Sequence, residues 1–310
     1  MQIFVTGASG WVGRGLVPDL IAHGHSVTAL ARSVAAATAL SAAGAEAIRG
    51  TLDDLDVLGD AASSADGVVH LAFKHDIAFS GGYGRAAEDD RVAIDALAEG
   101  LAGSGKPLVV ASGILGVVGV GPGVVATEDD GRATQTTVGP ISGGGDRSET
   151  ARHVLSLAER GIRASLVRLP PATHGAGDNG FTVAAIAAAR TAGVSAYVGE
   201  GNNRWPAVHR DDAARLFRLA VESAPAGSVL HAVGEGGVPI RAVAEAIAAG
   251  LDVPAVSVAA ADIADYLGFL GAFWAIDGPA SAQITRDLVG WAPARPGWLE
   301  DLRADFYFRG

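Results

Sequence analysis

The sequence predicts an α/β fold: a doubly wound parallel sheet followed by a smaller C-terminal lobe that covers the substrate. Over the first 170 residues, short β-type runs alternate with amphipathic stretches, which is the pattern of parallel strands joined by crossover helices. After Pro170 and Pro171 this alternation loosens into mixed segments with many loops. A length of 310 residues also exceeds what one core usually holds, so a second lobe is expected.

The alternation predicts six strands and three long helices in the first half. Gly24 and Gly161 are expected to end the first and last helices, because glycine is common just beyond a helix. The expected strands are Gln2–Thr6, Ser26–Ala31, Glu46–Arg49, Gly67–Ala72, Pro107–Ser112 and Arg163–Leu169, and the expected helices are Gly10–Ala22, Arg85–Ala102 and Arg147–Arg160.

The second half contains less regular candidate elements. Residues 1–170 are assigned to the sheet domain and residues 171–310 to the C-terminal lobe, with a segment of about 205–233 returning to the sheet domain. Asp212 is expected to cap the helix that it begins. The candidate elements are Trp205–His209, Asp211–Ser223, Gly227–Val233, Arg241–Leu251 and Ala280–Val289.

Composition excludes several classes of function. The formal charge is −11 and the basic residues form no block, so a nucleic-acid partner is not expected. With no cysteine, disulfides and thiolate metal sites are excluded, and no cluster of other ligands suggests a metal. No apolar run approaches the length of a membrane span, and the first residues lack the features of a signal peptide, so a cytoplasmic protein is expected.

A glycine-rich turn lies between the first strand and the first helix. Residues 6–13 read Thr-Gly-Ala-Ser-Gly-Trp-Val-Gly, the spacing of a dinucleotide-binding turn in a Rossmann-type domain. Gly7 permits the tight turn, Gly10 lets backbone amides approach the pyrophosphate, and Gly13 allows the helix to pack closely on the strand. The sequence therefore predicts a dinucleotide cofactor.

The end of the second strand predicts which dinucleotide. An acidic residue there would bind the ribose diol of NAD, whereas this chain has Arg32 followed by Ser33. Arginine makes charge-assisted bonds to a 2′-phosphate, so NADP(H) is favoured, although a solvated surface arginine is the alternative. The remaining residues assigned to the cofactor site are Ser9, Trp11, Val12, Thr51, Leu52, Leu71, Ala72, Phe73, Ser112, Leu169 and Pro170.

Several motifs in order along the chain resemble the extended short-chain dehydrogenase/reductase superfamily. They are the glycine-rich turn, His70-Leu71-Ala72, Arg168-Leu169-Pro170-Pro171 with His174-Gly175, and residues 208–213, Val-His-Arg-Asp-Asp-Ala. The resemblance implies that the C-terminal lobe closes over the nicotinamide. It also implies a catalytic Tyr-x-x-x-Lys pair with an upstream serine or threonine.

That pair is missing from this chain. None of the four tyrosines, Tyr83, Tyr197, Tyr266 and Tyr307, has a lysine four residues later, and the only lysines are Lys74 and Lys106. Where the superfamily has the pair, residues 143–149 read Gly-Gly-Gly-Asp-Arg-Ser-Glu, and Asp90 replaces a usual asparagine. The chain is therefore most similar to the atypical members, which are described as NAD-dependent epimerase/dehydratase-like.

Other residues are candidates for the proton transfer that the missing tyrosine would perform. Lys74 and His75, with Asp76, follow the fourth strand at its ligand end, and Ser112 ends the fifth strand. Tyr83 lies in a glycine-rich segment that resembles a lid, and His174 follows the sixth strand. Each also has a structural interpretation, as a polar loop residue, a turn residue or a packed side chain.

Three functions remain open from the sequence. The first is an NADP(H)-dependent reductase of a small, largely apolar carbonyl-type or related substrate with a non-standard proton donor. The second is a catalytically silent NADP-binding redox sensor, and the third is an epimerase or dehydratase that retains its nucleotide. A small-molecule substrate is expected, no membrane partner is expected, and a homodimer is left open.

Overall fold

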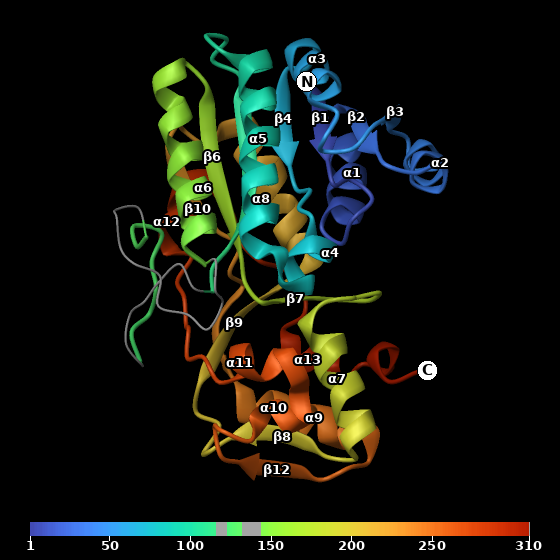
Figure 1. Ribbon diagram of the computed structural model, residues 1–310, viewed down its shortest axis with the longest axis vertical. Coiled ribbons are helices and arrows are strands. Elements are labelled where there is room, and N and C mark those ends of the chain that lie inside the picture. Colours follow the sequence, from blue (N-terminus) through green and yellow to red (C-terminus); the bar gives the residue numbers. More distant parts are fainter. Residues whose placement is uncertain (116–122, 132–143, 310) are drawn as a thin grey trace.

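The structure is a computed structural model that describes residues 1–115, 123–131 and 144–309, apart from the side chains of 144–147 and 305. It consists of a layered sheet domain and a smaller lobe (Figure 1). Within the described ranges, no helix combines the length and apolar character needed to cross a membrane.

Seven parallel strands form the larger sheet, in the order β10-β6-β5-β4-β1-β2-β3. The strand order reverses between β1 and β4, which is the doubly wound arrangement, and ligands bind at such a reversal beyond the carboxyl ends of the strands. The predicted fold class is therefore confirmed. The strands are β1 (Gln2–Thr6), β2 (Ser26–Ala31), β3 (Glu46–Arg49), β4 (Gly67–His70), β5 (Pro107–Gly113), β6 (Arg163–Leu169) and β10 (Ser228–His231).

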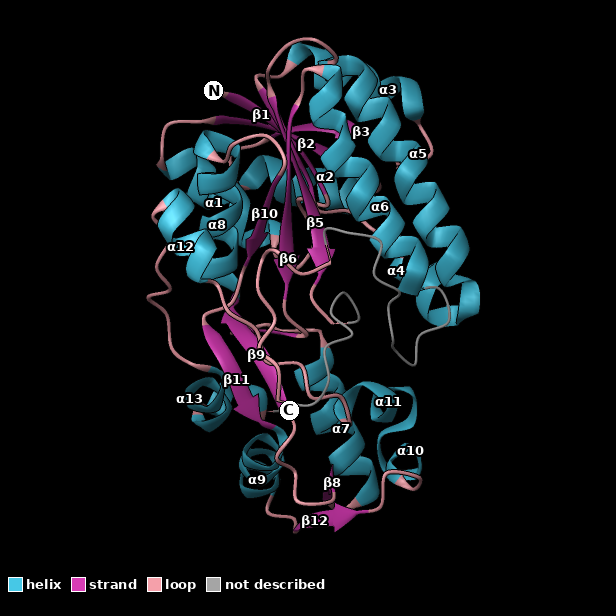
Figure 2. Cartoon of the chain, turned by 90° about the vertical axis from the view of Figure 1, so that its left-hand side faces the viewer, coloured by secondary structure: helices cyan, strands magenta, loops and turns pink. Residues whose placement is uncertain are grey.

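Helices cover both faces of this sheet (Figure 2). Along β1, Ile3 and Val5 pack in one core cluster with Leu16 of α1, whereas Phe4 packs in the other with Ile94 of α5. Both faces of the strand are thus buried, which explains its unbroken apolar sequence. The helices of this domain are α1 (Gly13–Ala22), α2 (Val34–Ala42), α3 (Leu55–Ser64), α4 (His75–Ile77), α5 (Tyr83–Leu101), α6 (Gly144–Ser156), α8 (Arg210–Ser223) and α12 (Gln283–Val289), with the short helices η1 (Ala78–Gly82) and η2 (Leu157–Arg160).

The smaller lobe has two small sheets and its own core. One sheet has the order β11-β9-β7 and the other pairs β12 with β8. The indole of Trp205 packs against those of Trp274 and Trp298, with ring centroids 5.1 and 6.3 Å away. The elements are β7 (Ala172–His174), α7 (Phe181–Ala192), β8 (Ser195–Val198), β9 (Arg204–His209), β11 (Glu235–Pro239), α9 (Ile240–Leu251), β12 (Ala255–Val258), α10 (Ile263–Leu267), η3 (Gly268–Leu270), α11 (Gly271–Trp274), α13 (Trp298–Arg303) and η4 (Asp305–Tyr307).

Among the corrections that the structure makes to the predicted elements are those at α1, β4 and α8. Helix α1 begins at Gly13 rather than Gly10, because the preceding residues form the turn, and β4 ends at His70 rather than Ala72. Asp212 does not cap α8. The cap is His209, whose Nδ1 accepts a hydrogen bond from the Asp211 amide at 3.1 Å, while the Asp212 carboxylate binds the amides of Ala294 and Arg295.

Candidate functional site

Gly7 and Gly13 of the glycine-rich turn are packed so tightly that neither admits a side chain. A Cβ on Gly7, which has φ +70°, would lie 2.6 Å from the Ala72 amide nitrogen, and one on Gly13 would lie 2.4 Å from the Gly7 carbonyl oxygen. The Gly10 amide donates to that same carbonyl at 2.9 Å. The turn therefore presents backbone at the N-terminal end of α1, where a pyrophosphate fits.

Trp11 connects this turn to the segment that follows β6. Its indole nitrogen donates to the Thr173 carbonyl at 2.8 Å, and the Arg210 guanidinium lies 4.6 Å from its ring centroid. Ser9 and Val12 flank Trp11 in the turn, and the Arg14 side chain donates to the Ser9 carbonyl at 3.0 Å. The side chain of Trp11 thus fixes the distance between the turn and the second lobe.

Two arginines lie together at the ends of β2 and β3. The register places Arg49 opposite Ala31, and its guanidinium donates to the Arg32 carbonyl at 3.4 Å. Both are exposed, and neither forms an ion pair with a carboxylate of the described residues. Ser33 caps α2 by accepting from the Ala36 amide at 3.1 Å. Sequence reasoning missed Arg49; its position as the last residue of β3 was the available signal.

Thr51 and Leu52, both assigned to the cofactor site from the sequence, lie in the turn after β3. The amide and hydroxyl of Thr51 donate to the Asp54 carboxylate at 2.7 and 2.9 Å, and these bonds lower the pKa of Asp54. Leu52 is buried in the core cluster that includes Phe4. The turn is therefore held rigidly beside the ends of β2 and β3.

The ends of β4, β5 and β6 form the other half of the sheet edge. Strand pairing sets His70, the last residue of β4, beside Val110, and Ser112 follows two residues later on β5. Ser112 is buried, and a Cβ on Gly113, the last residue of β5, would meet nothing within 4 Å among the described residues. On the neighbouring strand the Leu169 carbonyl accepts from the Ile114 amide, which brings the Leu169-Pro170 segment to the same edge.

A buried polar chain supports the end of β4. The Thr6 hydroxyl lies 2.8 Å from Nδ1 of His70, and Nε2 of His70 lies 3.1 Å from the Asp90 carboxylate. In this arrangement Nε2 donates to Asp90 and Nδ1 accepts from Thr6. Asp90 therefore orients a strand-end histidine, a role that sequence reasoning had not assigned.

Lys74 is held by carboxylates. Its ammonium donates to Asp53 at 2.6 Å and to Asp89 at 2.7 Å. Burial opposes the charged form, but the hydrogen bonds and charges of the two carboxylates outweigh it and raise the pKa of Lys74. This makes Lys74 a clamp between the loop after β3 and helix α5, and a poor proton donor at neutral pH.

His75 and Tyr83 lie around Phe73, directly beyond β4. The ring centroid of Phe73 is 5.1 Å from that of His75 and 6.1 Å from that of Tyr83. Of the predicted catalytic residues, the structure thus groups His75 and Tyr83 on one side of the strand ends, with Ser112 on the adjacent strand. Gly143, in the stretch that replaces the family pair, lies outside the described residues.

His174 belongs to a buried network instead. Its side chain is fully buried, and Nδ1 lies 2.6 Å from the Asp301 carboxylate, which is 3.9 Å from Nε2 of His209. Burial lowers the pKa of His209. His174 therefore ties β7 to α13, and its imidazole does not face the open strand ends.

Tyr307, near the C-terminal end of the chain, extends this network to the loop after β7. The Tyr307 hydroxyl accepts from the Gly175 amide at 3.1 Å and donates to the Asp178 carboxylate at 2.8 Å. Burial, followed by the negative charge of Asp178, raises the pKa of Tyr307, so this phenol stays protonated. Tyr307 thus supports the loop after β7 and takes no part in proton exchange near neutral pH.

A second buried network lies at the ends of β6 and β10. Arg168, fully buried, donates to the Asp130 carbonyl at 2.8 Å and to Nε2 of His231 at 3.2 Å, and His231 donates through Nδ1 to the Ser281 carbonyl. Burial, followed by the charge of Arg168, lowers the pKa of His231 to about 4. The network attaches residues 123–131 to the sheet edge.

This histidine predicts a pH-dependent stability. The unfolded chain protonates His231 near its ordinary pKa of about 6.5, whereas the folded chain does so only near 4. Neutral His231 therefore makes its full contribution to the free energy of unfolding above pH 6.5. This contribution is lost as the pH falls from about 6.5 toward 4, by up to about 3 kcal/mol. We expect urea unfolding at pH 7, 5.5 and 4.5 to show this loss. The His231→Gln variant should show a weaker dependence of the free energy of unfolding on pH. His153→Gln, a control at a partly exposed histidine, should keep the wild-type slope; equal slopes for all three proteins would contradict the prediction.

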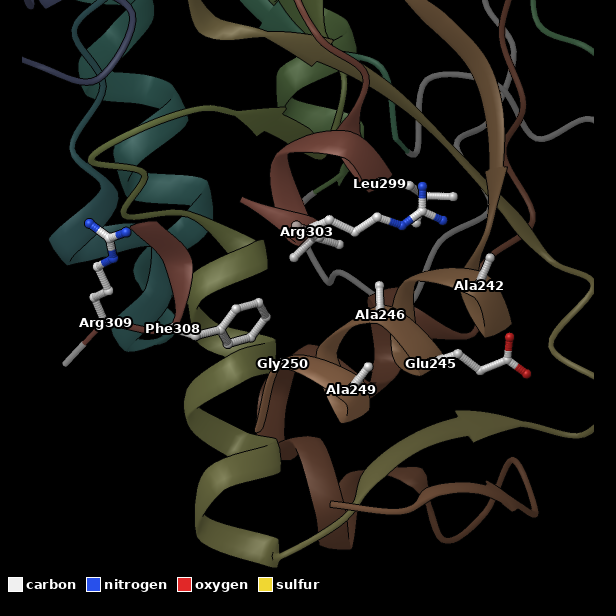
Figure 3. A pocket seen from close by; sticks show the side chains of 10 residues that line it. Ala242, Glu245, Ala246, Ala249, Gly250, Leu299, Arg303, Phe308 and Arg309 are labelled. Atoms are coloured by element: carbon white, nitrogen blue, oxygen red, sulfur yellow. The ribbon is translucent and has the colours of Figure 1, made fainter. Parts of the chain in front are cut away.

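A groove of about 710 Å³ lies elsewhere, between α9, α13 and the C-terminal residues (Figure 3). Its floor is formed by small residues of α9, including Ala246 and Gly250, and Phe308 packs against Gly250. These elements belong to the smaller lobe and include none of the predicted site residues. The candidate site is therefore the sheet edge, not this groove.

Comparisons with known proteins identify the family of this chain and proteins with a similar fold. An uncharacterized protein of Schizosaccharomyces pombe is 42% identical over 99% of this chain and 100% of its own length, and one of Saccharomyces cerevisiae is 40% identical over 99% of each chain. The solved UDP-glucose 4-epimerase of Thermotoga maritima has the same fold, with a TM-score of 0.77, 18% identity and coverage of 99% of this chain and 98% of that one. The sequence profile of the NAD dependent epimerase/dehydratase family matches residues 3–232, and the chain belongs to that family.

Proposed function

We propose that this protein is an NADPH-dependent reductase of a small, largely apolar carbonyl compound, with a proton donor other than the tyrosine of the usual pair. The observation that supports it most is an aromatic surface beside an intact dinucleotide edge. Phe73, His75 and Tyr83 gather beyond β4, and Ser112 lies near the end of β5, the next strand of the sheet. A redox cofactor at this edge would meet an apolar substrate.

The two exposed arginines support NADP(H) over NAD(H). Arg32 and Arg49 offer guanidinium groups beside the N-terminal end of α2, where the helix dipole also favours an anion. The Ser33 hydroxyl accepts from Ala36 and keeps its own proton available for a phosphate oxygen. A 2′-phosphate would satisfy all three groups, whereas a ribose diol would leave the two positive charges without a partner.

The charge pattern of the smaller lobe favours an apolar substrate over a nucleotide sugar. A diphosphate needs unpaired cations, yet Arg204 is paired with Asp277 and Arg241 with Glu245. Arg303 lines the groove between α9 and α13 instead of the sheet edge. Arg190 is in the last turn of α7, about 13 Å along the helix from Phe181 at its start. The lobe instead contributes aromatic side chains, Phe181, Phe269 and Phe273.

The residues at the strand ends divide the work of carbonyl reduction. A bound nicotinamide supplies the hydride, while the protein must orient the carbonyl and deliver one proton. We assign to the Ser112 hydroxyl a hydrogen bond to the carbonyl oxygen, and to His75 or Tyr83 the delivery of the proton. Lys74, held by two carboxylates, contributes through the position of the loop.

Ser112→Ala tests this division. We expect kcat for NADPH oxidation with a panel of apolar aldehydes and ketones to fall about tenfold, the effect of one lost hydrogen bond to the reacting oxygen. The dissociation constant for NADPH should stay within about twofold. Ser165→Ala, which removes a buried hydroxyl from the middle of β6, is the matched control and should retain kcat. Equal kcat values for the Ser112 variant and the wild type would contradict the role of Ser112.

A silent NADP-binding sensor is the second candidate, favoured by the missing Tyr-x-x-x-Lys pair. It predicts no turnover with any carbonyl despite tight cofactor binding, together with different affinities for NADP and NADPH. An enzyme that retains its nucleotide would instead purify with bound cofactor and would not oxidise added NADPH. The substrate panel and an assay of bound nucleotide distinguish the three.

A further inference from the structure

Two phenylalanines from different lobes meet while remaining mostly exposed. Phe79 of η1 is 57% exposed and Phe269 of η3 is 61% exposed, and their ring centroids are 5.9 Å apart. Large exposed aromatic side chains forgo the free energy of burial, and a contiguous pair of them marks a binding surface more often than a scattered residue does. We therefore interpret the exposed pair of rings as a surface that binds another molecule.

Ring contacts connect this pair to the cofactor edge. Phe79 stacks on His75 at 5.8 Å, and His75 contacts Phe73 at 5.1 Å, immediately beyond β4. On the other side, Phe269 lies 6.5 Å from Phe181, which contacts Phe273 at 5.2 Å. A continuous row of rings thus runs from the strand end into the smaller lobe, and a molecule bound there would lie next to the reacting end of the cofactor.

The backbone around both rings leaves room for a ligand. Gly81, with φ +93°, and Gly268, with φ +55°, each lie close in sequence to one ring, and a Cβ on either would meet nothing within 4 Å. Ser80 and Gly81 also depart from helical φ/ψ, so η1 is interrupted just after Phe79. Small rotations of short segments could separate the rings enough for a flat group to enter.

We propose that Phe79 and Phe269 form an aryl clamp, which binds the planar aromatic ring of a carbonyl substrate and directs its carbonyl toward Ser112. The inference rests on the proposed reductase function and adds the substrate class, aryl aldehydes and ketones. Aromatic faces favour flat rings in offset or tilted contact over flexible chains of equal area. The clamp also spans both lobes, so binding of the ring would hold the lobes together over the cofactor.

Binding of a ring that cannot be reduced tests the clamp independently of turnover. We would titrate NADP-saturated protein with 2-naphthol by calorimetry. Phe79→Ala and Phe269→Ala should each weaken binding about tenfold, and the double variant by less than the product, because the two rings also contact each other. Phe79→Leu should weaken it about threefold, since leucine keeps apolar area but not the ring face. Leu288→Ala, which removes an exposed apolar side chain of α12, should have no effect.

Turnover gives a second readout. The kcat/KM for 2-naphthaldehyde should fall with the naphthol affinity, whereas that for decanal, of similar size but flexible, should change by less than about threefold. Naphthol binding that depends on the two rings, without NADPH oxidation, would support the clamp and overturn the reductase.

Three results would overturn the clamp. They are no saturable naphthol binding to the folded wild type, equal affinities in all variants, and a dimer that becomes a monomer in the phenylalanine variants while naphthol affinity is unchanged. The last result, seen by sedimentation, would assign the ring pair to contact with a second copy. Melting curves identify any variant that fails to fold.

Discussion

Gly7→Ala is expected to weaken dinucleotide binding about 1000-fold, a loss of about 4 kcal/mol. Two physical costs combine. The residue has φ +70°, which costs an alanine about 1 to 2 kcal/mol, and its Cβ would lie 2.6 Å from the Ala72 nitrogen and 2.8 Å from the Leu71 carbonyl carbon. Both neighbours are backbone atoms, so the turn must move away from the end of β4 and distort the pyrophosphate cradle.

Gly24→Ala is the matched control for this prediction. Gly24 has φ +83°, but a Cβ there would meet nothing within 4 Å, so it carries the conformational strain without the collision. We expect this variant to lose about 1 to 2 kcal/mol of stability and to keep its NADPH dissociation constant within about twofold. Calorimetric titration and thermal unfolding of both variants provide the comparison. Equal NADPH affinities of the Gly7 variant and the wild type would contradict the prediction that the turn at Gly7 binds the pyrophosphate.

Arg32→Glu is expected to weaken NADPH binding about 100-fold while leaving NADH binding unchanged or improved. The variant removes charge-assisted bonds to a 2′-phosphate, each worth about 1.5 to 3 kcal/mol, and adds repulsion. The new carboxylate would also accept hydrogen bonds from a ribose diol. Arg49→Ala should weaken NADPH binding about tenfold, because the second guanidinium lies beside the first.

A control for net charge is needed, since the chain already carries a formal charge of −11. Arg190→Glu changes the net charge by the same amount in the last turn of α7 and should leave both cofactor affinities unchanged. A parallel loss of NADPH and NADH affinity in the Arg32 variant would mean that Arg32 does not select the 2′-phosphate.

The candidate site was only partly predictable from the sequence. Some of its residues have their interaction partners close by in the sequence, whereas others have partners many residues away. The glycine turn and Arg32 depend on neighbours within one βαβ unit, so local spacing identifies them. The residue type and loop position of Lys74 suggest a catalytic role, yet its ion-pair partners Asp53 and Asp89 lie 21 and 15 residues away in the sequence. No local sequence pattern predicts these ion pairs. Because they hold the ammonium of Lys74, they change the role that the lysine has in the site.

His174 and Phe79 show the same limit from opposite directions. His174 resembles an exposed turn residue in sequence, but Asp301, 127 residues later, pairs with it in the interior. Phe79 was not singled out from the sequence, and only the structure shows it exposed and in contact with Phe269. Burial depends on which segments meet, and a single stretch of sequence does not contain that information.

The sequence by itself determined the doubly wound sheet, the family resemblance and the position of the dinucleotide turn, because hydrophobic periodicity and glycine spacing are local consequences of backbone geometry. It also showed that the Tyr-x-x-x-Lys pair is absent. Only the tertiary structure decided where the polar residues beyond the strand ends lie, with His75 and Tyr83 grouped around Phe73 and with Lys74 and His174 held in ion pairs. The reason is physical: the burial and pairing of a charge depend on the elements packed around it, and these come from distant parts of the chain.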